Sequence, residues 1–117
     1  MNNESLPVTL ILASGSKYRS MLLQRLGLPF ECHPPNIDES TLEGESPLQQ
    51  VERLASAKAA AVNRDNPESV VVGSDQLAVF DAHVVGKPGG HQRAVRQLRS
   101  FSGQTVDFLT AVAVHSI

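Results

Sequence analysis

The chain is poor in cysteine, in net charge and in long apolar runs. Its one cysteine, Cys32, excludes an intrachain disulfide and favours an intracellular setting. Twelve acidic and 10 basic residues give a net charge of −2, so no global basic field favours a nucleic-acid polymer. The apolar runs are too short to span a bilayer, and the first residues carry Glu4 but no Lys or Arg, unlike a signal peptide. We therefore expect a soluble cytoplasmic protein that binds neither membranes nor nucleic-acid polymers.

What remains is an ordinary globular composition. Apolar residues make up 41% of 117 residues, which is enough for one compact domain over 1–117 with a core of its own. Apolar runs, turn residues and helical periodicity predict strands over 8–13, 29–33, 69–80, 83–85 and 104–114, and helices over 17–26, 47–63 and 91–102. This order predicts an α/β domain with a layered mixed sheet.

The middle of the chain carries the clearest local signals. Residues 34–45 are polar, begin with two prolines and predict a loop. The sequence Ser46-Pro47-Leu48-Gln49 is typical of a helix start, with a capping serine, proline at the first position and glutamine at the third. The strand predicted over 69–80 contains Gly73-Ser74-Asp75-Gln76, which we expect to interrupt it.

A first polar cluster lies between the first strand and the first helix. Ser14-Gly15-Ser16 is a small-residue turn that directs backbone N–H groups and a helix dipole at one spot, which favours an anion. Arg19, one turn later, could clamp a phosphate through two parallel hydrogen bonds. The alternative is a capped helix with a surface arginine, and it stays open because this is neither a Walker loop nor a GxGxxG motif.

A second candidate is Asp75, placed between Val72 and Leu77 in the most apolar strand. A carboxylate is costly to bury unless it is paired or binds a metal. Asp75 is therefore a candidate metal ligand or a base that activates water. The alternative is a strand that reaches the surface at this point.

The remaining candidates are two scarce lysines and one acidic side chain. Lys58 lies close to the apolar face of the second predicted helix, and Lys87 lies in the glycine-flanked loop 86–90. Either lysine could instead extend to solvent. Glu39, in the polar loop, could supply a second oxygen ligand to a metal, or could simply be exposed.

Together these segments resemble the Maf family of nucleotide pyrophosphatases. The matching segments share the order and spacing of the family and extend over essentially the whole chain: Leu12-Ala13-Ser14-Gly15-Ser16 with Arg19, Asp38-Glu39, Ala57-Lys58-Ala59, Gly73-Ser74-Asp75-Gln76, Gly86-Lys87-Pro88 and Ser102-Gly103. The resemblance implies a fold similar to the inosine-triphosphate pyrophosphatases, with a nucleotide cleft between two lobes. Family members are considerably longer, so we expect the second lobe to be incomplete.

The resemblance also implies a reaction and a role for each candidate. A nucleoside triphosphate would be hydrolysed between its α- and β-phosphates with Mg²⁺ or Mn²⁺. Asp75 would be the proton acceptor and a metal ligand, and Glu39 would help to hold the metal. The triphosphate would be bound by three cations and two hydroxyls that we expect to converge on one cleft: Arg19, Lys58, Lys87, Ser14 and Ser16.

Two further positions concern the base. In the family, the branch that acts on dTTP and UTP usually has a basic residue where this chain has Tyr18, and threonine where it has Gln76. The branch resembling the 7-methyl-GTP pyrophosphatases has an aromatic residue and a glutamine. Because a methylated guanine is cationic, an aromatic face attracts it. The resemblance therefore favours 7-methyl-GTP or a similar modified nucleotide.

Two alternatives to this function remain open. The first keeps the reaction and changes the substrate to dTTP or UTP. The second is a nucleotide-binding regulatory module with little catalysis, linked to septum formation as Maf proteins are. A homodimer is a further possibility, since an exposed sheet edge can promote pairing.

Overall fold

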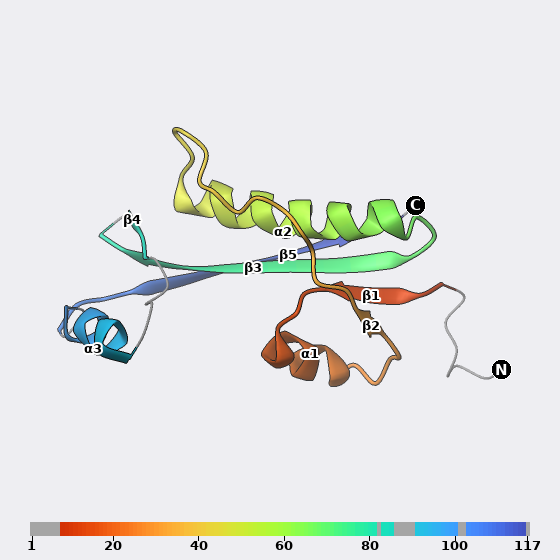
Figure 1. The fold of residues 1–117 in the computed structure, drawn as a ribbon, viewed down its shortest axis with the longest axis horizontal. Coiled ribbons are helices and arrows are strands. Elements are labelled where there is room, and N and C mark those ends of the chain that lie inside the picture. The colour runs from red at the N-terminus through yellow and green to blue at the C-terminus, as the bar shows by residue number, and fades with distance from the viewer. Residues whose placement is uncertain (1–7, 82, 86–90, 101–102, 117) are drawn as a thin grey trace.

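The computed structural model describes residues 8–81, 83–85, 91–100 and 103–116. Five strands and three helices are found among these residues, in the order predicted from the sequence (Figure 1). Their bounds are β1 Leu10–Ala13, α1 Lys17–Gln24, β2 Glu31–Cys32, α2 Pro47–Asp65, β3 Val70–Phe80, β4 His83–Val84, α3 His91–Ser100 and β5 Asp107–His115. None of the described helices has the length and apolarity that crossing a bilayer requires.

The strands form one mixed sheet, which confirms the predicted α/β class. Its order is β2-β1-β3-β4, and β5 pairs with β3 as well. The β1 strand runs parallel to β2 and β3, whereas β4 and β5 run antiparallel to β3. The long strand β3 therefore pairs with three other strands, β1, β4 and β5.

The predicted interruption of β3 at residues 73–76 is wrong. The strand runs without a break from Val70 to Phe80, and β5 pairs with it through this whole segment. The polar residues fit because side chains of a strand alternate between the two faces of a sheet. Asp75 points to the buried face, where it is paired, and Gln76 is exposed on the other face.

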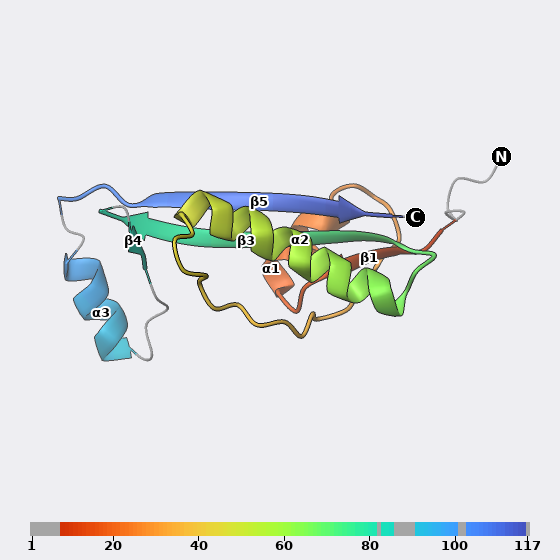
Figure 2. The same cartoon turned by 90° about the horizontal axis from the view of Figure 1, so that it is seen from above.

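The helix α2 covers one face of β3 and β5, as Figure 2 shows from above. Its start is the predicted capping box, in which Ser46 and Gln49 bond each other's backbone N–H. The core joins α2 to the sheet and contains Ile11, Ala13, Ala59, Val62 and Val71. Leu48, in the first turn of α2, is 56% exposed.

The opposite face of the sheet carries α1, which lies beside β1 (Figure 1). No residue of α1 is buried, and Leu22 and Leu26 are both exposed. On β5, Phe108, Val112 and Val114 are exposed as well. The core cluster thus lies between α2 and the sheet, and on β1 Leu12, which alternates with Ile11 and Ala13, is buried as well.

The α2 helix lies unusually close to β3 at Gly73. A Cβ atom on residue 73 would lie 2.7 Å from the backbone nitrogen of Ala59, and closer still to the carbonyl oxygen of Ala55. Real Cβ atoms essentially never come so near to backbone atoms, so any side chain here would push α2 off the sheet. Glycine at 73, with alanine at 55 and 59, sets the distance between the two elements.

We expect Gly73→Ala to lower the free energy of unfolding by about 3 kcal/mol, the upper part of the usual range for overpacking a core. The clash is with helix backbone, which cannot swing aside as a side chain can. Urea unfolding followed by circular dichroism would measure it. Gly15→Ala is the matched control, because a Cβ there would meet Pro34 at an ordinary 3.6 Å. Equal stability of the two variants would contradict the close approach.

Candidate functional site

The ammonium group of Lys58 is paired with two carboxylates. Its Nζ atom lies 2.8 Å from Oδ1 of Asp75 and 3.0 Å from Oε1 of Glu39. The side chains of Lys58 and Asp75 are 9% and 7% exposed, whereas that of Glu39 is 58% exposed. The cluster is therefore buried on one side and open to solvent at Glu39.

The fold explains how these distant residues meet. Asp75 follows Gly73 by two positions on β3, so both residues lie on the face of the strand that packs against α2. Lys58 precedes Ala59, whose backbone touches the Gly73 position. The close approach at Gly73 therefore brings the base of the Lys58 side chain over β3, and the ammonium group reaches Asp75 one pleat further along.

The second carboxylate oxygen of Asp75 is buried and has no hydrogen-bond partner among the described residues. Burying an unsatisfied charged oxygen is costly, and such groups in native proteins commonly bind an ion, a water or a ligand. Mg²⁺ is usually held by one or two carboxylates together with substrate phosphates and water. Asp75 and Glu39 fit such a partial ligand set, and the described residues contain no group of three acidic, histidine or cysteine side chains that would hold a metal alone.

The turn after β1 is closed by hydrogen bonds that its two serine hydroxyls accept. Ser14 is buried, and its hydroxyl accepts a hydrogen bond from the Ser16 backbone N–H at 3.0 Å. Ser16 caps α1, accepting from the Arg19 N–H at 3.2 Å. Beside this turn lies a hollow of about 430 Å³ whose walls include Ser14, Gly15, Ser16, Lys17, Met21 and Cys32.

The turn and the Lys58 cluster are adjacent in the sheet. Ala13 at the end of β1 pairs with Gly73, so the chain leaves β1 at Ser14 beside the level where β3 reaches Asp75. Neighbouring strands lie about 4.8 Å apart. The hydrogen bonds of the described residues do not join Arg19 to the cluster. Lys87 lies outside the described residues, so the convergence of all three cations stays a prediction.

Tyr18 and Gln76 are both exposed, and neither lies on the Asp75 face of β3. Tyr18 is 67% exposed on α1. Gln76 donates to the hydroxyl of Thr110 on β5 at 3.2 Å, and it points to the face where α1 lies. The two base-specificity candidates thus share one side of the sheet, and Asp75 uses the other.

An open edge of β3 connects the two sides. On one edge, β1 pairs with β3 only as far as Gly73, and β4 pairs with it only from Val79. Ala78 accepts a hydrogen bond from Val85. Within the part of the chain that the structure describes, residues 74–77 therefore have no strand beside them on this edge. A ligand at this gap would reach Asp75 and Gln76 together.

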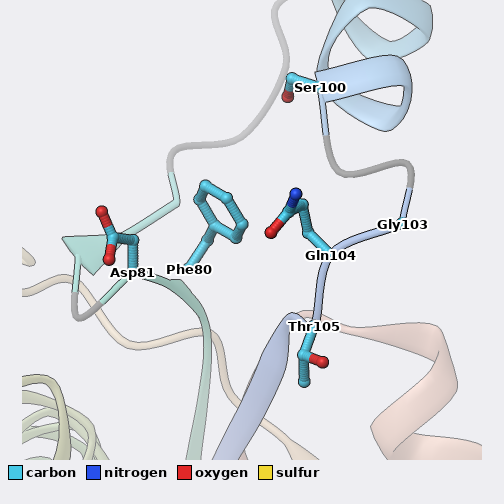
Figure 3. Close-up of a pocket in the computed structure, with 6 residues that line it drawn as sticks. All are labelled: Phe80, Asp81, Ser100, Gly103, Gln104 and Thr105. Carbon is cyan, nitrogen blue, oxygen red and sulfur yellow. The ribbon is translucent and has the colours of Figure 1, made fainter.

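A second and larger hollow, of about 570 Å³, lies at the far end of β3 (Figure 3). Phe80 and Gln104 face each other across it, with Asp81, Ser100, Gly103 and Thr105 around them. Among the residues that the structure describes, none of the predicted site residues lines this hollow. Its size alone does not make it the functional site, since the buried, incompletely bonded carboxylate lies elsewhere.

Sequence reasoning missed the residues that hold the loop carrying Glu39. Arg53 on α2 bonds Glu45 and the carbonyl oxygen of Ser40, and the buried Gln50 accepts from Thr41. Both anchors lie on α2, but helical periodicity describes only contacts within the helix. A basic residue on a helix that follows an acidic loop was the one signal available.

Comparison with known proteins supports the resemblance seen in the sequence. A family model described as Maf-like protein matches residues 9–117. The chain is 58% identical over 105 residues to a 7-methyl-GTP pyrophosphatase of Polaromonas sp., covering 90% of this chain and 48% of that protein. Proteins of the same name from Nitrosococcus oceani and Bordetella pertussis are 52% and 51% identical, over 92% and 94% of this chain.

In those two relatives the matched part is 54% and 55% of the protein. The chain thus spans about half the length of the curated relatives it matches. The family model nevertheless covers almost every residue of the chain, and it includes both the Ser14 turn and the Lys58 cluster. This chain belongs to the Maf family.

Proposed function

We propose that the protein is a nucleoside triphosphate pyrophosphatase that hydrolyses the α–β phosphoanhydride bond and releases a monophosphate and pyrophosphate. The observation that carries the proposal is the Asp75 carboxylate, which is buried against Lys58 with its second oxygen unpartnered. An oxygen in this state can accept a proton from water at the rim of the cluster. The names of the relatives support the same reaction class.

In this reaction, the oxygen of a water molecule forms a bond to the α-phosphorus while the bond to the bridging oxygen breaks. Pyrophosphate leaves with the bonding electrons, and Asp75 accepts the proton of the water. Lys58, which already lies between two carboxylates, offsets negative charge at the phosphates. The Ser14 and Ser16 hydroxyls and the Arg19 guanidinium bind further phosphate oxygens, since the Ser14 and Ser16 N–H groups already donate to Leu12 and Ser14.

Asp75 and Glu39 are the residues that would hold a divalent cation. When bound, Mg²⁺ or Mn²⁺ would supply positive charge that polarises phosphoryl oxygens. Binding to Glu39 is feasible without unfolding, because this side chain is more than half exposed and, among the described residues, its ion pair is with Lys58. The protein's own contribution is to hold both carboxylates against a single ammonium group.

We further propose 7-methyl-GTP or a similarly modified nucleotide as the substrate. The open edge of β3 lets a nucleotide place its phosphates at Asp75 and its base at Gln76 on the other side of the sheet. Tyr18 lies on that side with its ring exposed, and a cationic methylated guanine would stack on it. Gln76 offers both a donor and an acceptor to a base edge.

Asp75→Asn should lower pyrophosphate release by at least about a hundredfold, the usual scale for losing a general base. Asparagine keeps the shape of the side chain, so the protein should still unfold cooperatively. Asp107→Asn, an exposed position on the neighbouring strand β5, is the matched control and should retain activity. Near-normal turnover by Asp75→Asn would rule out the assignment. Nucleotide binding without turnover in the wild type would favour the regulatory alternative.

Tyr18→Ala should weaken 7-methyl-GTP relative to GTP, mainly in KM, whereas Tyr18→Phe should retain the preference. Because the ring is exposed, we expect about 1 kcal/mol, or roughly fivefold, the value of a solvent-accessible cation–π contact. The contact lasts through the reaction, which is why kcat should change little. The measurement is kcat/KM for 7-methyl-GTP, GTP, dTTP and UTP. A wild-type preference for the pyrimidine nucleotides would overturn the choice of substrate but not of reaction.

A further inference from the structure

We infer that Arg53 is a positioning residue for Glu39. By binding Glu45 and the Ser40 carbonyl, it holds the loop between β2 and α2 so that the Glu39 carboxylate stays against Lys58. The inference rests on the proposed function, because it assigns Glu39 a role at the reaction site. Among the described residues, Arg53 forms no hydrogen bond with Glu39 or Asp75.

The Arg53 guanidinium joins two ends of the loop. Its Nε and Nη2 atoms donate to the two carboxylate oxygens of Glu45, the second at 3.0 Å, and Nη2 also donates to the Ser40 carbonyl oxygen at 2.9 Å. The Glu45 side chain is 7% exposed and that of Arg53 is 29% exposed, so the carboxylate is the more shielded partner. Ser40 directly follows Glu39, so the arginine fixes the backbone next to the carboxylate in question.

The charge states of the pair favour a permanent contact. The hydrogen bond from Arg53 lowers the pKa of Glu45, and the bond to Glu45 raises the pKa of Arg53. Both groups therefore stay charged across the neutral range. The contact weakens only as the pH falls through the lowered pKa of Glu45.

Other bonds brace the same loop. The Thr41 hydroxyl donates to the Gln50 side chain at 2.9 Å, and the Ser40 N–H donates to the Asp38 carboxylate at 2.9 Å. Residues 38–42 have no helix or strand to hold them, so these side-chain contacts set their place. Glu39 itself is exposed and depends on its neighbours for position.

A competing role for Arg53 is direct binding of a phosphate. Its positive charge interacts with Asp38 and Asp75, both near the reaction site. The two roles make opposite predictions for Glu45→Gln. Glu45→Gln weakens the contact between Arg53 and the loop and frees the guanidinium. It should therefore weaken metal binding if Arg53 positions Glu39, and strengthen nucleotide binding if Arg53 binds a phosphate.

The test uses Mn²⁺ as the probe, with free Mn²⁺ measured by electron paramagnetic resonance in the purified protein. Arg53→Lys and Glu45→Gln should each weaken Mn²⁺ binding about tenfold, the lower end for losing a residue that orients a metal ligand. In a Glu39→Gln background each change should weaken Mn²⁺ binding by less than about twofold, because the Glu39 carboxylate is no longer there to be positioned. Arg64→Lys, in the last turn of the same helix, is the matched control and should change nothing.

Equal losses of Mn²⁺ affinity from Arg53→Lys or Glu45→Gln, with and without the Glu39 carboxylate, would overturn the inference. The effect of Arg53 would then not depend on that carboxylate. Tighter Mn²⁺ or nucleotide binding in Glu45→Gln would overturn it in favour of phosphate binding. If the wild type releases no pyrophosphate, the proposed function fails and amide hydrogen exchange of residues 38–42 decides the positioning role. Exchange about tenfold faster in Arg53→Lys, but not in Arg64→Lys, would support the inference, and unchanged exchange would refute it.

Discussion

The absence of a side chain at residue 73 is the constraint on which the site depends. Because Gly73 has no side chain, the α2 backbone at Ala55 and Ala59 occupies the space that a Cβ atom on residue 73 would need. The neighbouring Lys58 is thereby brought close enough to bond Asp75 directly. A wider spacing would leave a buried carboxylate without a partner, which is among the most costly defects in a protein interior. The close packing of α2 on β3 is therefore also what allows Lys58 and Asp75 to pair.

The strand β3 carries the polar residues beside this pair on both of its faces. It carries Asp75 on the face packed against α2 and Gln76 on the face that α1 shares. Within the described parts of the chain, one edge of β3 has no strand beside it between the end of β1 and the start of β4, where Ser74, Asp75 and Gln76 follow Gly73. Continuous β-structure, rather than a break, is what holds these alternating side chains in fixed directions.

The charged groups of the Lys58 cluster differ in how they are held. Lys58 and Asp75 are held by the core, whereas Glu39 belongs to a loop without regular structure and is exposed. Arg53 and Gln50 connect that loop to α2, so the same helix supplies the ammonium group and the anchors of its second partner. A loop held at a few polar contacts can keep its carboxylate in place and still admit a substrate from solvent.

The sequence by itself determined the order of elements, the mixed α/β class, the capped start of α2 and the family. These depend on local periodicity, on turn residues and on motifs at characteristic spacing. Only the tertiary structure decided that β3 is unbroken, that Asp75 and Gln76 use opposite faces, and that Arg53 holds the loop of Glu39. The continuity of β3 depends on strand pairing, and the other contacts join residues far apart along the chain. No local pattern encodes them, because their energy comes from packing distance, burial and charge in the assembled fold.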